Sequence, residues 1–478
     1  MYACIGIIAN MRTLLYRTLI LLTIFGLIFT PPVVTGYIEL ERADSVMDNG
    51  KFSDAATRYE RVTRLLPWRG DLWQRAGMAQ FFAAEYTEAI PLFERARQED
   101  SLSAQGWDWL GQSYWQMDDY ESAQGAWTAG LAAYPTYIKY YAHLSMAYYE
   151  QGDMVAERQA LEQWVASGGE ITAAAHYRLG QLLTVSDSDK ALSQFLIASS
   201  LDPEYDTAVE TMRVTLNLAS FESDQSRRLV VIGRGLGLVA EWPLAADAFR
   251  QAVAADGENA EAWAWLGEAE QQLGRDGRVQ LDKALSLEHT NPIVRSLRGL
   301  YWTRQNRPQQ ALAEYLLTAE YDQGNPTWQY AIGEIYTQLG DLPPALEHYQ
   351  RATEIAPADA TAWRLLATFC AQYNFQLEET GLPAAQMAVE LDDQSPLTLD
   401  TLGWTLALLE RYNEARDALE QSISLDPNFA QGYLHLAIVA MQLDNWATAH
   451  GYLKQARELD EFGPAGEQAQ ILLNQYFP

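Results

Sequence analysis

The sequence predicts an all-α fold, an α-solenoid in which pairs of helices stack one after another. A small residue recurs at intervals close to 34 residues, an alanine follows it twelve positions later, and many intervals end in a proline-containing stop such as LDPNF. The chain has 478 residues, which exceeds the size of one compact core. A chain of this length can fold by repeating one unit of two helices at a fixed period, and we predict about twelve such helix pairs in all.

Residues 1–35 are set apart from the repeats. Arg12 and Arg17 precede an uncharged apolar run, and about 17–25 such residues span a bilayer. We expect residues 12–34 to form a hydrophobic membrane helix, a signal anchor with its amino terminus in the cytoplasm and the repeats outside. The alternatives are a cleaved secretory signal, which would leave a secreted protein, and a buried helix of a soluble protein. Met11 is an alternative start to Met1.

The recurring small residue is seen at Gly403, inside the helical pattern TLGWTLALLERYNEARDALEQSISLDP of residues 401–427. Glycine within a helix costs about 1 kcal/mol relative to alanine, so its recurrence needs a structural reason. A small side chain lets two helix axes approach more closely than the usual separation of about 8–10 Å. We predict that the small residues at the eighth and twentieth positions of the units pack the helices together: Gly77, Gly111, Gly233, Gly267, Gly299, Gly333, Gly403, Ala89, Ala123, Ala345 and Ala415.

The same register divides the chain into domains. A block of five units is predicted at residues 36–205 and a block of seven at 226–463, and one unit has Glu157 where alanine is expected. Residues 206–225 do not complete a unit, so we interpret them as an extra helix and a loop at a seam, which is either a bend or a degenerate unit. Residues 464–478 are predicted to form a capping helix that closes the last core face with Ile471, Leu472, Leu473 and Tyr476.

One unit shows a known motif in full. The segment WDWLGQSYWQMDDYESAQGAWTAGLAAYP, residues 107–135, contains in order Trp107, Leu110, Gly111, Tyr114, Ala123, Trp127 and Pro135. This spacing resembles the tetratricopeptide repeat, a helix–turn–helix unit of 34 residues, with tryptophan in the position usually held by phenylalanine. The resemblance implies a right-handed superhelix whose inner groove, lined by the first helix of each unit, binds a protein or peptide partner.

The resemblance also indicates which residues face the groove, since these lie near positions 2, 5, 9, 12 and 13 of each unit. The lysine at position 5 and the asparagine at position 9 with which chaperone-binding members hold a terminal carboxylate are absent. The groove candidates that remain are Trp115, Tyr330, Arg364 and Trp404. The rings of Trp115, Tyr330 and Trp404 are expected either to stack on a peptide or sugar or to pack against neighbouring units.

Composition and charge argue against several classes of function. The chain has 63 acidic and 33 basic residues, and its net charge of -30 repels nucleic acid. Its six histidines are scattered, and Cys370 falls at a core position, so no metal site is expected. The sequence GRGLGL at 233–238 lacks the full spacing and the preceding strand of a dinucleotide loop, so no cofactor is expected. No residue is assigned a catalytic role.

Two hypotheses of function follow. The first is a non-enzymatic scaffold, anchored to a membrane, that binds proteins outside the cytoplasm. The second is an envelope subunit that binds carbohydrate or assists glycan processing, and it is motivated by the 26 tyrosines and 15 tryptophans.

Overall fold

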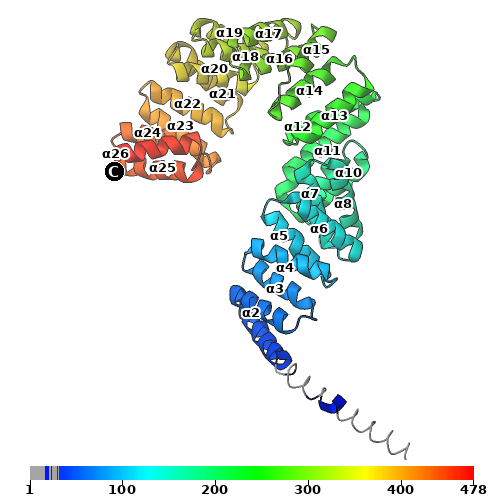
Figure 1. The fold of residues 1–478 in the computed structure, drawn as a ribbon. Coiled ribbons are helices and arrows are strands. Elements are labelled where there is room, and N and C mark those ends of the chain that lie inside the picture. Colours follow the sequence, from blue (N-terminus) through cyan, green and yellow to red (C-terminus); the bar gives the residue numbers. More distant parts are fainter. Residues whose placement is uncertain (1–16, 21–22, 24–29, 31, 169–170, 478) are drawn as a thin grey trace, which may run out of the picture. The chain divides into compact units, whose positions relative to one another are not determined.

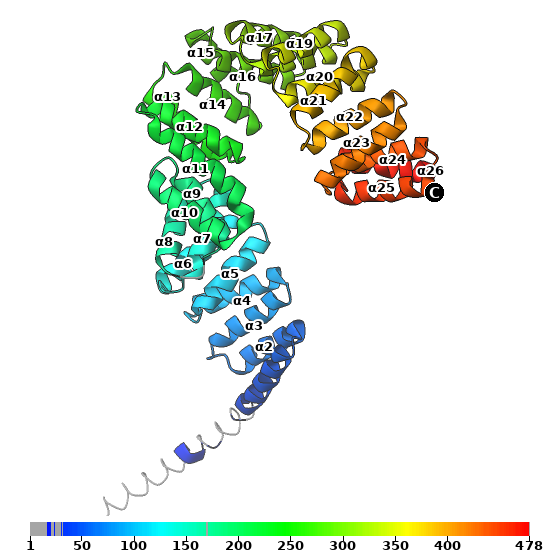
Figure 2. The ribbon, with the colours of Figure 1, turned by 180° about the vertical axis from the view of Figure 1, so that it is seen from behind.

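The computed structural model of the chain describes residues 17–20, 23, 30, 32–168 and 171–477. These residues form helices and connecting turns with no β-strand among them, and consecutive helices lie side by side in both views (Figures 1 and 2). The prediction of an all-α solenoid is therefore confirmed for this part of the chain. Most of the predicted membrane segment, residues 12–34, lies outside the described residues. Among the described ones, no helix has the length and apolar character needed to cross a bilayer.

The chain divides into two compact units, of which the first ends at Leu216 and the second starts at Asn217, inside helix α11 (Asp206–Phe221). In the first unit, residues 32–48 are helical. The following elements are α2 (Phe52–Leu65), α3 (Asp71–Phe82), α4 (Tyr86–Gln98), α5 (Ala104–Gln116), α6 (Tyr120–Ala133), α7 (Lys139–Gln151), α8 (Met154–Ala166), α9 (Ala173–Leu183), α10 (Ser188–Leu201) and the short 3₁₀ turn η1 (Pro203–Tyr205).

The second unit continues the pattern with α12 (Gln225–Leu238), α13 (Trp242–Ala255), α14 (Ala260–Gln272), α15 (Arg278–Leu287), α16 (Pro292–Arg304), α17 (Pro308–Tyr321), α18 (Pro326–Gln338) and α19 (Leu342–Ile355). It ends with α20 (Ala360–Tyr373), the π-helical turn η2 (Leu377–Gly381), α21 (Leu382–Leu391), α22 (Pro396–Leu408), α23 (Tyr412–Leu425), α24 (Ala430–Gln442), α25 (Trp446–Leu459) and α26 (Pro464–Tyr476). We call the earlier member of each pair, such as α22 in α22/α23, the first helix, and the later member the second helix.

Helix starts are fixed by local chemistry. Side chains of Ser103, Asp119 and Asp224 accept hydrogen bonds from backbone N–H groups in the first turns of α5, α6 and α12. Proline opens several first helices, for example Pro292 in α16 and Pro396 in α22, because its missing N–H has no partner at that position anyway. Proline thus marks several helix starts, whereas Pro427 of the predicted stop LDPNF lies in the turn before α24.

Within a pair, a large side chain of the second helix lies against the glycine of the first. A Cβ atom added to Gly77 would lie 2.9 Å from the ring of Phe93, and one added to Gly299 would lie 2.7 Å from the ring of Tyr315. Such distances leave no room for a methyl group, so the glycine is required by close approach. Trp127 lies over Gly111 in the same way and is 1% exposed.

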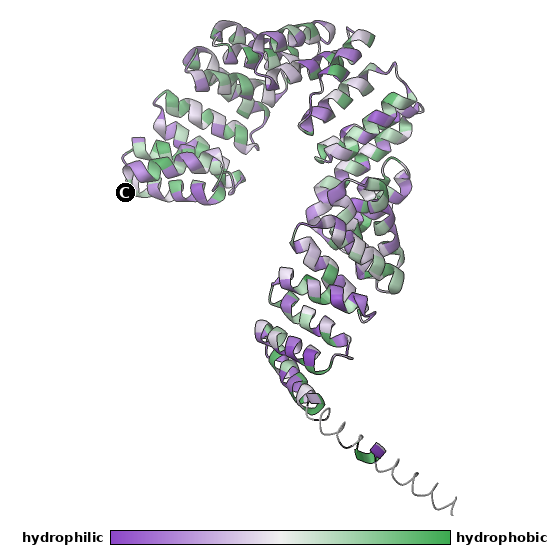
Figure 3. Ribbon diagram, viewed as in Figure 1, coloured by the Kyte–Doolittle hydropathy of each residue, from purple (hydrophilic) through white to green (hydrophobic). Residues whose placement is uncertain are grey.

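Hydrophobic and hydrophilic residues alternate along the helices (Figure 3). The apolar ones form successive local clusters between neighbouring helices, such as the cluster around Phe93 and Trp109 and the cluster around Leu419 and Leu436. Cys370 is buried in another of these clusters, as expected for a small apolar group. The core of each unit is therefore a series of interfaces between adjacent helices.

The capping prediction for α26 is partly wrong. Leu473 is 7% exposed and packs with the last cluster, whereas Ile471 and Tyr476 are 62% and 44% exposed. The packed face of α26 is formed by residues four apart, Ala465, Ala469 and Leu473, and Ile471 lies on the opposite side of the helix.

Candidate functional site

A pocket of about 380 Å³ lies on three consecutive first helices of the second unit, α20, α22 and α24. Two of the four groove candidates, Arg364 and Trp404, line it. Thr368, Thr401 and Gln431 add hydrogen-bonding groups to its wall. The structure thus brings together two candidates that are forty residues apart in sequence.

Trp404 is held in place by His435. The indole of Trp404 on α22 and the imidazole of His435 on α24 are stacked, with 4.2 Å between ring centroids and 11° between ring planes. Nδ1 of His435 lies 2.8 Å from Oδ1 of Asp400, and Nε2 lies 2.8 Å from the side-chain nitrogen of Gln431. A neutral imidazole fits both contacts, because it donates from Nδ1 to the carboxylate and accepts from the amide at Nε2.

This bonding fixes the imidazole, and the imidazole in turn covers one face of the Trp404 ring. His435 and Asp400 are 8% and 7% exposed, so the polar pair is shielded from water on most sides. Trp404 is therefore a positioned wall of the pocket. On the side of His435 it is not a free platform on which a sugar could stack.

Arg364 supplies the positive charge of the pocket. Its guanidinium makes no hydrogen bond or ion pair with any other described residue, although the side chain is half-buried. A guanidinium presents five N–H donors in a planar fork that suits carboxylates and carbonyl groups. The pocket therefore combines an aromatic wall with a cation whose hydrogen-bonding capacity is unused by the protein.

The other two groove candidates lie elsewhere. The hydroxyl of Tyr330 on α18 is buried without a hydrogen-bond partner among the described residues. Burial raises the pKa of Tyr330 to about 12, with a further increase from the charge of Asp359 and an opposing effect from Arg364. Trp115 on α5 packs against Tyr120 and Trp127, with ring centroids 4.7 Å and 5.9 Å away. Trp115 is thus partly buried and packs against a core cluster of the first unit.

A second aspartate–histidine pair lies in the first unit. Nε2 of His143 on α7 is 3.1 Å from Oδ1 of Asp108 on α5, out of line for a hydrogen bond, and the imidazole stacks on Trp127. Tyr137 donates from its hydroxyl to Oδ2 of the same carboxylate over 3.3 Å. The groove positions of single units do not predict these two pairs, although both have aspartate at position 5 of one predicted unit and histidine 35 residues later.

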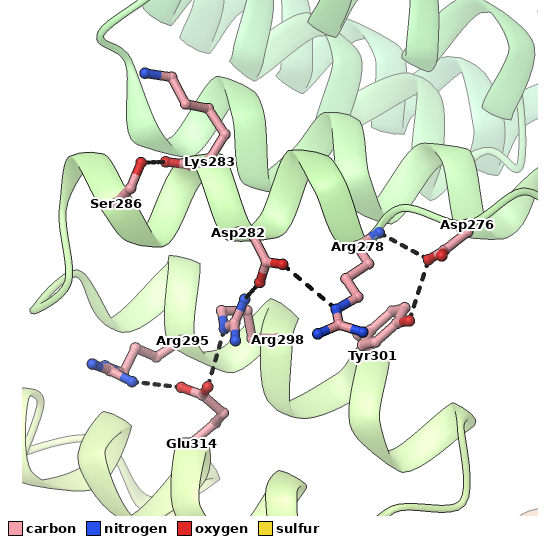
Figure 4. A network of polar contacts seen from close by, with 9 residues as sticks. All are labelled: Asp276, Arg278, Asp282, Lys283, Ser286, Arg295, Arg298, Tyr301 and Glu314. Atoms are coloured by element: carbon pink, nitrogen blue, oxygen red, sulfur yellow. Dashed lines mark hydrogen bonds and ion pairs between the residues drawn. The ribbon is translucent and has the colours of Figure 1, made fainter.

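Several other buried charges are neutralised within the solenoid. In Figure 4, Glu314 of α17 accepts from Arg295 over 2.6 Å and from Arg298 over 3.0 Å, both on α16. Arg298 also binds Asp282 of α15, so one guanidinium connects three consecutive helices (Figure 4). Glu268 on α14 is paired with Arg304 on α16 through two hydrogen bonds of 2.7 Å and 2.8 Å. These arginines pair with carboxylates of neighbouring helices. Arg364, in contrast, has no such ion pair with a described residue.

Among the described residues, no three histidine, cysteine, aspartate or glutamate side chains are grouped so that they could hold a metal ion.

One tetratricopeptide repeat model matches residues 40–105, 110–171 and 239–278, and another matches residues 396–429. A third model, described as TPR repeat, matches residues 333–368. No curated protein matches the chain.

Solved structures of similar fold include yeast Tom70, with 13% identity and a TM-score of 0.41 over 92% of this chain and 95% of that one. The Cut9–Hcn1 hetero-tetramer of the APC/C has 14% identity and a TM-score of 0.38 over 95% and 99% of the two chains. YrrB, described as a TPR protein with an unusual peptide-binding site, has 20% identity and a TM-score of 0.31 over 40% and 98%.

Proposed function

This chain carries tetratricopeptide repeats, and from that premise we propose that it is a non-enzymatic scaffold that binds a protein or peptide partner along its first helices. Repeats of this kind typically serve as interaction scaffolds, because their stacking creates extended concave surfaces that bind partners. The scaffold has about twelve repeats in this proposal, divided at residues 206–225 as the sequence suggests.

The observation that carries the proposal is the pocket on α20, α22 and α24. Its aromatic wall is held by a buried polar pair, and its one arginine has no partner within the described chain. An extended peptide can hydrogen-bond to Arg364, Thr401 and Gln431 while an apolar side chain contacts the ring edge of Trp404. Such pre-positioned polar and aromatic groups lower the cost of ordering the site when a partner binds.

The proposal also places the scaffold at a membrane. Residues 12–34 form the anchor, with the repeats outside the cytoplasm, and the support for this comes from the apolar run and the arginines that precede it. Removal of residues 1–35 should shift the chain from the membrane fraction to the soluble fraction. Retention in the membrane fraction after this deletion would contradict the anchor.

Site-specific photo-crosslinking in the native cells tests the binding surface. A photoreactive amino acid at Gln372, which lines the pocket on α20, should capture a protein or peptide of defined mass. The same group at Gln421, an exposed residue of the second helix α23, is the matched control and should capture little. Arg364→Ala should reduce the yield at Gln372 about tenfold, equivalent to about 1.4 kcal/mol of binding free energy.

Equal yields at the two positions, or a yield that Arg364→Ala leaves unchanged, would place the binding surface elsewhere. Arg364 makes no hydrogen bond or ion pair with another described residue, so thermal unfolding of this variant should stay close to that of the parent chain. A match separates loss of binding from loss of structure.

A further inference from the structure

A second surface lies at the carboxyl-terminal end of the second unit, on α25, α26 and the turn between them. We call it the end face and define it by Glu458, Glu461, Phe462, Glu467 and Ile471. These residues line a pocket of about 730 Å³. Phe462 and Ile471 are 87% and 62% exposed, which is unusual for side chains of their size.

The position of Ile471 indicates the shape of what binds there. α26 packs on α24 and α25 as a first helix does, and Ile471 is the eighth residue from Pro464, as Gly403 is the eighth from Pro396 on α22. On α22 that position is covered by Leu419 of the second helix. Ile471 therefore lies at the position where the second helix packs on an earlier first helix such as α22.

Isoleucine in place of glycine changes the packing distance. An added Cβ at Gly403 would lie 2.5 Å from Leu419, so the close approach of α22 and α23 depends on the missing side chain. At Ile471 a helix cannot come as near, and the side chain instead projects between the ridges of a helix at the ordinary separation of about 8–10 Å. The end face thus suits a helix docked at this ordinary separation.

The charged residues of the end face indicate which kind of helix can bind there. Glu458, Glu461 and Glu467 form no ion pair with any described residue. The cation of this surface, Arg457, donates to Oε1 of Gln470 over 3.0 Å. Three carboxylates around two exposed apolar side chains match lysine or arginine flanking an apolar stripe. A second copy of the chain would instead bring the same carboxylates together, on a protein whose net charge is -30.

From these observations we propose that the end face binds a basic amphipathic helix of a partner protein. Its apolar stripe packs on Phe462 and Ile471, and its lysine or arginine side chains pair with Glu458, Glu461 and Glu467. This binding is independent of the pocket on α20, α22 and α24, because the two share no lining residue.

Fluorescence anisotropy with the full chain tests the proposal. The probe is a labelled helical peptide of leucine and lysine, with leucine at the i, i+3, i+4 and i+7 positions, and the matched peptide has glutamate in place of lysine. The leucine–lysine peptide should bind and the leucine–glutamate peptide should not. Phe462→Ser with Ile471→Gln should weaken binding about tenfold or more, and Glu461→Gln with Glu467→Gln should weaken it and reduce its dependence on salt.

Matched controls exclude general attraction between a cationic peptide and an acidic protein. Leu238→Ser with Val279→Ser changes two apolar residues that are 78% and 74% exposed on other helices. Glu320→Gln with Glu347→Gln removes two exposed carboxylates elsewhere. Both control pairs should leave the affinity unchanged, and equal weakening by control and end-face variants would overturn the proposal.

Sedimentation velocity tests the competing occupant. A dimer of the parent chain that Phe462→Ser with Ile471→Gln dissociates would show that a second copy covers the end face, and it would also overturn the proposal. The two side chains are exposed, so their replacement should preserve the fold, as monitored by circular dichroism. Should that variant unfold, the glutamine variants at Glu461 and Glu467 still decide the outcome.

Discussion

At the scale of single residues, close packing of the helices depends on glycines that have no side chain. Gly403 lies against Leu419, and an added Cβ would meet its Cγ at 2.5 Å and the carbonyl oxygen of Ala415 at 3.1 Å. Gly451 also lies inside a helix, α25, yet an added Cβ there would meet nothing within 4 Å. Close packing therefore requires glycine at position 403, whereas the space around Gly451 would accept a larger residue.

This contrast gives a matched pair of substitutions. Gly403→Ala should destabilise the protein by about 1–3 kcal/mol, because overpacking forces the helices apart. Gly451→Ala should stabilise it by up to about 1 kcal/mol through helix propensity. Urea unfolding followed by circular dichroism measures both changes. A shift of the same sign in the two variants would contradict the packing role of Gly403.

A second prediction at this scale concerns pH. Burial raises the pKa of the Glu270 carboxyl, but hydrogen bonds and charges from Arg275 and Arg250 outweigh that effect, so the pKa lies below its ordinary value. The carboxyl oxygens are 2.9 Å and 3.0 Å from these guanidinium groups. A depressed pKa in the folded state means that the unfolded chain binds the proton more readily.

The stability that Glu270 contributes is therefore present above the pKa of the unfolded chain, about 4.3, and is lost as the pH falls through the lower folded value. Glu270→Gln removes this titration. Its unfolding midpoint should be lower than that of the parent chain near pH 7, and the difference should shrink as the pH is lowered from about 6 to 3. A difference independent of pH would mean that the carboxyl has the same pKa in the folded and the unfolded chain, which would contradict the effect of the two arginines.

At the scale of helices, one predicted unit has a buried ion pair where most units have a small residue. Glu157 on α8 stands where most predicted units have alanine, and it is 2% exposed. Arg178 on α9 donates to its two oxygens over 2.7 Å and 3.0 Å. The carboxylate is thus accommodated between α8 and α9 by the guanidinium that the next helix provides.

Removal of one partner should therefore cost more than removal of both. Arg178→Met leaves a buried unpaired carboxylate and should destabilise the protein by about 3–5 kcal/mol. The double variant Glu157→Ala with Arg178→Met restores alanine to the pattern and should come within about 1 kcal/mol of the parent chain or exceed it. Thermal unfolding of the single and double variants gives the coupling between the two residues. Additive effects would contradict it.

The fold was predictable at this scale because each helix pair repeats the same requirement for a small residue. The pattern did not indicate which side chain fills the space, as with Trp127 over Gly111. It also left open where a longer interval places its extra residues. In the structure these lie between α20 and α21, where Asn374 and Gln376 have φ angles of 46° and 47° and lead into the π-helical turn η2.

The candidate site was predictable only in part. Arg364 and Trp404 follow from groove positions within single units and do line one pocket. Asp400 and His435 belong to different predicted units, and their pairing arises when two first helices lie side by side. Trp115 occupies a groove position as well, but rings from the same unit cover it. The position of a residue within the repeat predicts which way its side chain points. It does not predict which residues the side chain contacts.

At the scale of the whole molecule, stability comes from a series of local interfaces. Core clusters form between adjacent helices, and each involves a short stretch of sequence. An array of this kind behaves as a chain of nearest-neighbour couplings, so a weakened interface should open locally. Hydrogen exchange read by mass spectrometry resolves this, because it reports opening separately for each helix.

Two equivalent substitutions in different units make the test. Gly403→Ala should increase exchange in α20 to α25 and leave α3 to α8 at the rate of the parent chain. Gly111→Ala, which brings a methyl group against Trp127, should do the reverse. Exchange that rises along the entire chain in both variants would instead indicate one cooperative unit, since loss of any interface would then open all of them. The two local responses, each confined to the substituted region, are what a solenoid of separately packed helix pairs requires.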